Sequence, residues 1–186
     1  MACNLTLGRK EPCKDVVGGI KNIYIVNYGG IVPVYDGTDT DVIQSVGSSV
    51  ANLNYEIKGN SSFEQTVNAS RENGTVFYEQ TLNLTLHKLT KEDNKELKLM
   101  AYGRPHIVVE DYNKNLFIMG LENGADVSGG TVVTGGAMGD LSGYTLVLTA
   151  QELAPANFIE KTAATESVAT TLTNAGFASP TEGTNS

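Results

Sequence analysis

Apolar and polar side chains alternate along two neighbouring stretches of the chain. Residues 61–71 alternate in this way. So does the stretch "TVFYEQTLNLTLH" at 75–87, in which the side chains at most of the alternate positions are apolar. Asn73 and Gly74 lie between the two stretches, and both residue types tolerate the positive φ that a tight hairpin turn needs. The pattern therefore predicts a long antiparallel hairpin from 61–71 and 75–87.

Similar patterns predict further strands. They lie at residues 20–28, 54–59, 106–112, 115–121 and 143–152. The stretches 106–112 and 115–121 are expected to form a second hairpin. The Gly-rich residues 122–143 are predicted to be a loop with a short strand at 131–134. Pro33 lacks a backbone N–H and argues for a sheet edge around residues 29–42.

One helix is predicted from Lys91 to Tyr102. Thr90 is a favourable N-cap, Gly103 suits the C-terminal end, and Pro105 stops the helix. Its apolar stripe is narrow, so we expect it to cover one side of a sheet.

Length and composition fit one folded domain. The chain has 186 residues, of which 40% are hydrophobic and 18% charged, and this allows a packed core. We predict a mainly β protein, an antiparallel β-sandwich or open barrel with one flanking helix. Residues 1–19 form an extended N-terminal arm, 20–160 the β domain, and 161–186 a flexible C-terminal tail.

The tail is rich in Ala, Thr and Ser and has few large apolar side chains, so it is not expected to fold alone. Phe177 is a large apolar side chain within the tail, and Phe158 and Ile159 lie just before it. We expect them to dock on the domain or on a neighbouring subunit, and we add Tyr35 to this set of predicted inter-subunit residues.

The formal net charge is −8 and no run of basic residues occurs. Such a chain is a poor general binder of nucleic acid, although acidity helps where DNA must pass without sticking. No apolar stretch has the length of a membrane span or the pattern of a signal peptide, so we expect the chain to stay in the cytoplasm where it is made. Cys3 and Cys13 are interpreted as free thiols.

No catalytic or metal-binding motif emerges. His87 and His106 lie outside any nucleophile motif and are interpreted as ordinary strand-end histidines. Asp36, Asp39 and Asp41 only partly resemble an oxygen-rich cation loop. We predict no catalytic residue, no metal and no cofactor, and therefore not an enzyme.

The polar side of the predicted hairpin is unusual because it lacks Lys and Arg. It consists of Glu64, Thr66, Asn68, Ser70, Glu79, Thr81, Asn83 and Thr85. One interpretation is a face that looks at bulk water, as in many antiparallel sheets. The other is the wall of a water-filled channel, since a hydroxyl-rich and mildly acidic surface does not retain DNA. Composition leaves both open.

The order of these elements resembles a known family. A long hairpin is followed by the capped helix "TKEDNKELKLMAYGR", then by "PHIVVEDYNKNLFIMGLENG", a Gly-rich loop and "GDLSGYTLVLTAQE". Over roughly residues 20–157 the chain is similar to the tail tube proteins of tailed bacteriophages and their relatives in contractile injection systems. The resemblance rests on element order and not on a catalytic fingerprint.

The resemblance implies a structural virion protein in the phage tail. In that family six subunits form a ring, rings stack, and strands of adjacent subunits join into one barrel around the channel. The eight polar hairpin residues would then face the lumen, with Glu64 and Glu79 beside the DNA path. Partners would be further copies of the chain, other tail, baseplate or sheath proteins, and genomic DNA in transit.

Three alternatives stay open. The same fold also serves tail hubs, adaptors and head-to-tail connector rings, so a single ring is as consistent with the pattern as a tube. A non-catalytic β-sandwich that decorates a capsid or acts as an adhesin would instead use exposed aromatic side chains such as Tyr28, Tyr35 and Tyr112. A small enzyme using Asp36, Asp39 or His106 is the least favoured.

Overall fold

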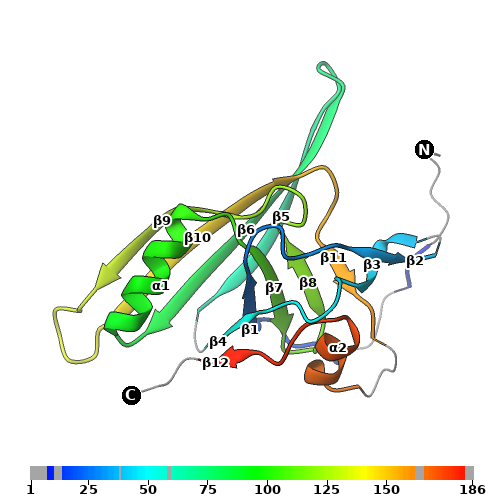
Figure 1. The fold of residues 1–186 in the computed structure, drawn as a ribbon. Coiled ribbons are helices and arrows are strands. Elements are labelled where there is room, and N and C mark those ends of the chain that lie inside the picture. Colours follow the sequence, from blue (N-terminus) through cyan, green and yellow to red (C-terminus); the bar gives the residue numbers. More distant parts are fainter. Residues whose placement is uncertain (1–7, 11–13, 38, 58–59, 162–165, 183–186) are drawn as a thin grey trace.

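The computed structural model describes residues 8–10, 14–37, 39–57, 60–161 and 166–182. Within them, two β-sheets pack face to face and one longer helix covers one side of the sandwich (Figure 1). The prediction of a mainly β sandwich with a flanking helix is confirmed. The two sheets stay open and do not close into a barrel.

The smaller sheet has four strands, all in antiparallel pairs. In order across the sheet they are β5 (Ser62–Ser70), β6 (Thr75–His87), β10 (Gly143–Glu152) and β9 (Asp126–Val133).

The larger sheet has eight strands. In order they are β12 (Thr181–Glu182), β4 (Leu53–Glu56), β1 (Ile20–Val26), β7 (His106–Asp111), β8 (Leu116–Met119), β11 (Asn157–Ile159), β3 (Asp39–Ser45) and β2 (Val34–Asp36). As Pro33 indicated, β2 lies at the sheet edge.

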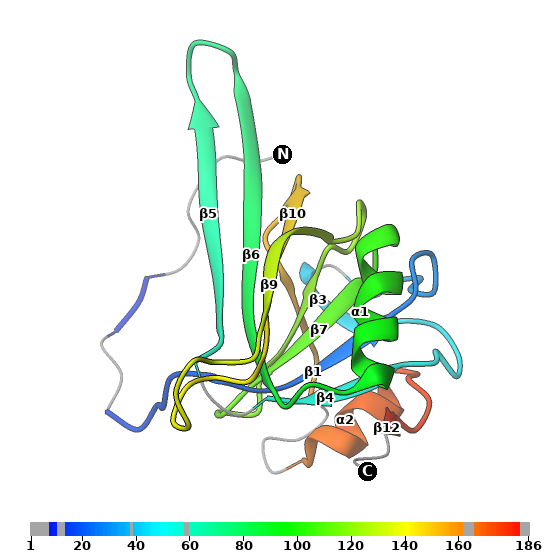
Figure 2. The same ribbon diagram turned by 90° about the vertical axis from the view of Figure 1, so that its left-hand side faces the viewer.

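The long hairpin forms as predicted. β5 pairs with β6 from Ser62 opposite Asn83 to Ser70 opposite Thr75. Gly74 takes a positive φ of 63° in the turn, a conformation that costs glycine little. The far end of the hairpin projects well beyond the body of the molecule (Figure 2).

Helix α1 (Lys91–Tyr102) also has the predicted bounds. The Thr90 hydroxyl accepts a hydrogen bond from the Asp93 N–H at 3.0 Å, and Met100 is buried against the sheets. Burial, and then the negative charges of Glu96 and Asp93 on this helix, raise the pKa of Tyr55 to about 12. The helix therefore packs its acidic side near β4.

The main core lies between the two sheets. Its apolar side chains come from both sheets and from α1: Ile23, Ile107, Met119, Leu82, Leu148 and Met100 are members. Leu82 and Leu148 are fully buried, which confirms that the apolar side of the hairpin strand faces inward.

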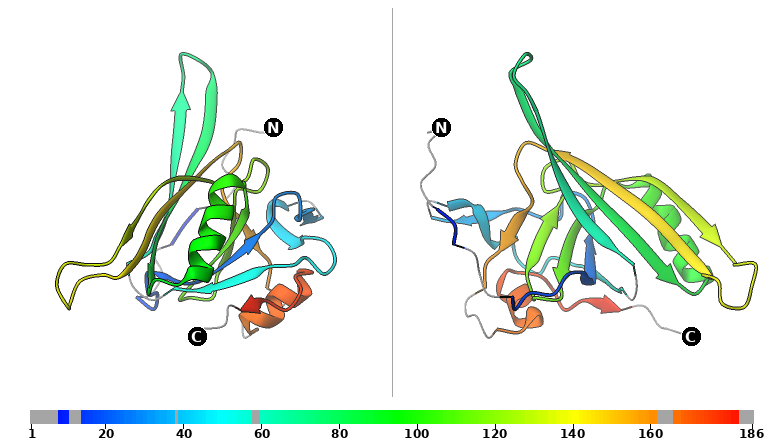
Figure 3. Two further views of the ribbon diagram at one scale, coloured as in Figure 1. Left: turned by 60° about the vertical axis from the view of Figure 1, so that its left-hand side comes forward. Right: turned by 180° about the vertical axis from the view of Figure 1, so that it is seen from behind.

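A second core lies on the opposite face of the eight-stranded sheet. Helix α2 (Val168–Asn174) and the segment after it cover this face, with Leu172 and Phe177 buried against Tyr24 and Val108. The molecule thus has three layers, and α2 sits on the far side from the four-stranded sheet (Figure 3).

Two sequence predictions differ from the structure. Residues 166–182 of the predicted flexible tail instead form α2 and β12 on the domain, because Val168, Leu172 and Phe177 supply a small apolar stripe. Residues 126–133 form the full strand β9 and not a loop with a short strand at 131–134. Here Gly129 and Gly130 remove the side chains that would have revealed the alternation.

Candidate channel-lining face

The predicted polar residues of the hairpin share one face of the four-stranded sheet. Glu64 lies opposite Thr81, and Thr66 lies opposite Glu79. Directly opposed residues of an antiparallel pair point to the same side, so the two strands present one continuous surface. The eight predicted residues are exposed or only partly buried, and none lies in the core. Whether this surface lines a channel stays a prediction.

β10 and β9 extend the same surface. Thr81 is paired with Thr149, Thr85 with Thr145, and Thr145 in turn with Thr131, whose hydroxyl is hydrogen-bonded to that of Thr145. Sequence reasoning did not assign these β10 and β9 residues to the polar face. The alternation within "GYTLVLTAQE" was the signal that could have included Thr145 and Thr149.

We call this surface the polar face. It comprises Glu64, Thr66, Asn68, Ser70, Glu79, Thr81, Asn83, Thr85, Thr131, Thr145 and Thr149. The four strands contain no Lys or Arg. Three carboxylates lie on this side of the sheet: Glu64, Glu79 and Asp126, which is opposite Thr149. Two apolar side chains share it, Phe77 opposite Asn68 and Val147 opposite Asn83. The Asn68 side-chain amide donates to Glu79 at 3.3 Å. Chemically, the face can hydrate and repel a polyanion but offers it no cation.

Both outer strands of this sheet have an unpaired side. Among the described residues, β5 pairs only with β6, and β9 pairs only with β10. The nine-residue β5 contains neither Lys nor Pro, the usual residues that protect an edge strand against pairing with another chain. Three successive antiparallel pairs also make β5 and β9 run in opposite directions.

The hairpin tip exposes apolar side chains. β10 pairs with β6 only as far as Tyr78, so the residues of the hairpin nearer the turn have no third strand beside them. On the side opposite the polar face, Val67 is 57% and Val76 is 53% exposed. The projecting end of the hairpin therefore carries a small apolar surface on this side.

The four predicted inter-subunit residues divide into two pairs. Ile159 and Phe177 are buried in this chain's own second core and are unavailable to a neighbour. Phe158 is 48% exposed, and Tyr35 packs partly against the second core. Phe158 is therefore the most accessible of the four to another subunit.

His106 is held by structural hydrogen bonds. The ring is 2% exposed, its Nδ1 lies 2.6 Å from the Gly120 carbonyl oxygen, and its Nε2 accepts from the Gly29 N–H at 3.0 Å. Tyr28 stacks on the ring, and the Arg104 guanidinium lies over Tyr28. Both ring nitrogens are thus engaged within the fold.

The carboxylates do not assemble into a metal site in the described part of the chain: no three His, Cys, Asp or Glu residues there gather closely enough to hold an ion. Asp41 is on the surface, and the side chains of Asp36 and Asp39 lie outside the described residues, as do Cys3 and Cys13. His87 is exposed at the end of β6.

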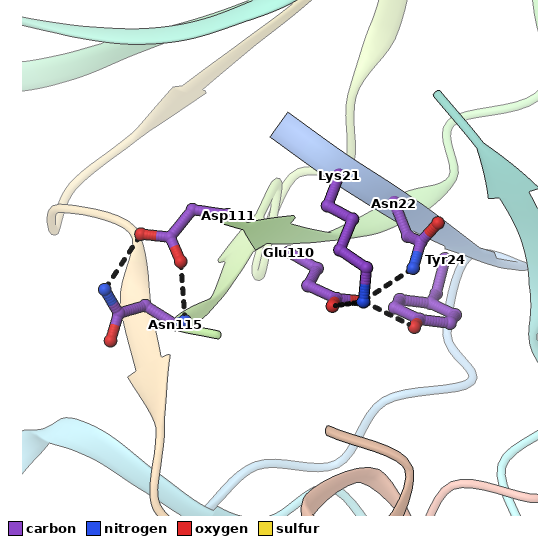
Figure 4. A network of polar contacts seen from close by, with 6 residues as sticks. All are labelled: Lys21, Asn22, Tyr24, Glu110, Asp111 and Asn115. Carbon is purple, nitrogen blue, oxygen red and sulfur yellow. Dashed lines mark hydrogen bonds and ion pairs between the residues drawn. The ribbon is translucent and has the colours of Figure 1, made fainter. Parts of the chain in front are cut away.

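Two buried carboxylates have structural partners instead. Glu110 accepts from Lys21 at 2.9 Å and from Asn22 and Tyr24 at 2.8 Å, as Figure 4 shows at the β1–β7 pair. Burial first, and then this hydrogen bond, raise the pKa of Tyr24 well above its usual range. The carboxylate pins β7 to β1 on the face that α2 covers.

Glu152 lies at the end of β10 beside a cavity of about 240 Å³ that Glu122 and Gln80 also line. Its Oε1 accepts from the backbone N–H groups of Glu122 and Asn123 at 3.2 and 2.9 Å. Burial raises the pKa of Glu152, although these two hydrogen bonds act in the opposite direction.

Comparison of the chain with protein-family models, with curated proteins and with solved structures found no match. No helix in the described part of the chain is long and apolar enough to cross a membrane.

Proposed function

We propose that the chain is a ring-forming structural subunit of a phage tail tube, whose four-stranded sheet lines a channel for DNA. The observation that carries the proposal is the polar face. It runs across all four strands without a basic residue, on a sheet whose two outer strands each pair on one side only within the described part of the chain.

Ring closure follows from the directions of the outer strands. Because β5 and β9 are antiparallel, β9 of a second copy can add beside β5 and continue the alternation without interruption. Repeating this step around a rotation axis gives a closed barrel with no exposed sheet edge, and closure is how natural β proteins remove such edges.

The size of such a barrel fits a channel. Six copies, the number that the family resemblance implies, would contribute 24 strands. At about 4.8 Å per strand the circumference is about 115 Å and the diameter about 37 Å before strand tilt. Barrels with 16–18 strands already hold a water-filled channel, so this one has room for a nucleic-acid duplex and its water.

The charges of the polar face favour passage of DNA through the channel over binding of DNA. Affinity for DNA comes chiefly from Lys and Arg contacts to phosphate. The polar face supplies hydroxyls, amides and the carboxylates of Glu64 and Glu79, so a duplex in the lumen would meet water and weak repulsion.

A single hub, adaptor or connector ring is the second candidate function, and the same polar face favours it. The two candidates differ in whether rings stack. Stacking would use the projecting hairpin tip, because its exposed Val67 and Val76 extend beyond the body of the subunit towards a further ring of the same chain.

Negative-stain electron microscopy with light scattering on the same sample tests the proposal. We expect rings or stacked tubes with a central hole, and a mass that is a whole multiple of the subunit. Stacked tubes would favour the tube over the hub. A chain that stays monomeric at high concentration would contradict the ring.

A further inference from the structure

The sandwich is closed on one side and open on the other. On the β9–β10 side, α1 covers the space between the sheets, with the Tyr144 hydroxyl donating to the Thr90 carbonyl oxygen at 3.0 Å. On the β5 side an open cleft of about 350 Å³ lies between the sheets, lined in part by Ile20, Val109 and Phe63.

Three phenylalanine rings extend from this cleft across the inner side of the larger sheet. Phe63 on β5 lies 6.2 Å from Phe117 on β8, and Phe117 lies 4.6 Å from Phe158 on β11, measured between ring centroids. Phe63 and Phe117 are partly buried and Phe158 is 48% exposed. We call Phe63, Phe117 and Phe158 the phenylalanine row.

A complementary surface lies on the outer side of α1. Lys95, Leu99 and Tyr102 are spaced by four and three residues and so lie on one helix face. All three are exposed, Leu99 by 55% and Tyr102 by 80%, although a leucine on a helix normally faces the core. We call this surface the α1 stripe. Figure 1 places α1 and β9 on one side of the molecule and β11 on the other.

From these two surfaces we infer that the α1 stripe of one copy docks on the phenylalanine row of the next copy around the ring. This inference rests on the proposed ring and specifies its subunit contact. When β9 of a second copy adds beside β5, the α1 that lies under that β9 arrives at the open side of the sandwich. There it closes the cleft just as each chain's own α1 closes the opposite side.

Charge also favours the α1 stripe of a neighbouring copy as the surface that docks at the cleft. Asp111 lines the cleft, and its carboxylate accepts only from amide groups in the described structure: the Asn115 backbone and side chain at 2.7 and 2.8 Å, and the Asn113 side chain at 3.3 Å. Lys95 at the edge of the incoming stripe would supply a cation. Apolar side chains would thus meet apolar side chains, with a lysine beside the aspartate.

The contact is head-to-tail, which makes a mixing experiment decisive. Leu99→Glu spoils the stripe and leaves the row intact, whereas Phe158→Glu does the reverse. Leu99 is exposed and Phe158 is half exposed in the single chain, so each variant is expected to fold, with a melting temperature lowered by no more than a few degrees. We expect each variant alone to weaken ring formation at least tenfold. In an equal mixture, the intact stripe of the Phe158→Glu chain can dock on the intact row of the Leu99→Glu chain. The mixture should therefore give heterodimers with one intact contact, which cannot extend to a closed ring.

Val32→Glu is the matched control, because Val32 is 65% exposed and belongs to neither surface. Rings that form normally from Leu99→Glu and from Phe158→Glu would overturn the docking contact while leaving the proposed ring in place.

A covalent test covers the case in which assembly is weak. In a chain with Cys3 and Cys13 replaced by Ser, we would introduce Leu99→Cys with Phe158→Cys and oxidise the sample. A ladder of disulfide-linked oligomers that ends at the ring size supports the contact, and the Leu99→Cys, Val32→Cys pair should give none. A wild-type chain that is monomeric together with an absent ladder would overturn both the contact and the ring.

Discussion

Glu110 shows how one side chain joins two strands of the larger sheet. It is 1% exposed, and its carboxylate collects donors from three residues of β1, namely Lys21, Asn22 and Tyr24. Lys21 is half exposed, so its charge is partly balanced by water. The stabilisation therefore comes mainly from satisfied hydrogen bonds and not from the ion pair itself.

Replacing this carboxylate is expected to be costly. Glu110→Ala leaves the buried Tyr24 hydroxyl and the Asn22 amide without their acceptor, and each unsatisfied group costs about 1–3 kcal/mol. We expect a loss of about 2–4 kcal/mol in the free energy of unfolding, measured by urea denaturation. Glu64→Ala on the exposed polar face is the control and should change stability by less than about 0.5 kcal/mol. Equal losses in the two variants would contradict this role.

The raised pKa of Glu152 predicts the direction in which stability changes with pH. Its carboxyl pKa in the folded chain is raised above the ordinary value of 4.5, chiefly by burial. As the pH rises, Glu152 therefore loses its proton in the unfolded chain at a lower pH than in the folded chain. Its contribution to the free energy of unfolding falls as the pH rises from about 4.5 to the raised pKa. Glu152→Gln removes the ionisation, so its melting temperature should exceed that of the wild type at pH 7.

The difference should shrink as the pH falls towards 4, where both forms are neutral at this position. Scanning calorimetry across this pH range measures it, with Glu64→Gln as the exposed control. A difference that does not vary with pH would mean that hydrogen-bond geometry, and not ionisation, governs this site.

Buried polar side chains show what the sequence cannot predict at the scale of single residues. Gln80 occupies an inward position of β6, between the inward-facing Tyr78 and Leu82, and is 1% exposed. Its Oε1 accepts from the Gly120 N–H at 3.0 Å. The alternation of β6 places the side chain inside, but its partner lies 40 residues away in sequence. Only the folded chain reveals that contact, and the same holds for the donors to Glu110.

At the scale of whole elements, strong local signals were predictive. The hairpin and α1 have both a long periodic pattern and matching turn or cap residues, and their bounds agree with the prediction to within one residue. β9 lacks such a pattern because of Gly129 and Gly130. Helix α2 is seven residues long and depends on the second core for its stability, so its sequence alone carried little signal.

The C-terminal segment gives a prediction at this scale. Phe177 is 3% exposed under α2, whereas Phe158 is 48% exposed. Phe177→Ala should lower the free energy of unfolding by about 3–5 kcal/mol, as for other buried phenylalanines. Phe158→Ala should cost under about 1 kcal/mol in the monomer, since little buried volume is lost. Urea denaturation at low protein concentration compares the two. Similar losses would contradict the docked position of the segment.

At the scale of the whole molecule, the proposed assembly depends on geometry that no local sequence pattern contains. The sequence predicted a polar side of one hairpin. The two unpaired strand edges, their opposite directions and the extension of the polar face over β10 and β9 follow only from the sheet order. In the proposed ring, these features make one polar hairpin part of a repeating segment of the channel wall.

The charge of that wall can be reversed without touching the proposed subunit contacts. Glu64 and Glu79 lie on the polar face, away from the phenylalanine row and the α1 stripe. Glu64→Lys with Glu79→Lys should therefore leave assembly intact. It should also convert the lumen from weakly repelling DNA to retaining it, because each subunit gains two potential phosphate contacts.

The expected result is salt-dependent retention of duplex DNA by assembled double-variant tubes and none by wild-type tubes, measured by fluorescence anisotropy at two salt concentrations. Glu79→Gln is the control for the lost contact to Asn68, since it keeps a hydrogen-bond acceptor and adds no positive charge. A double variant that folds normally but fails to assemble would place these residues in a subunit interface. Assembly without any gain in DNA retention would place them on the outside of the ring, and either result would move the channel to another face of the sandwich.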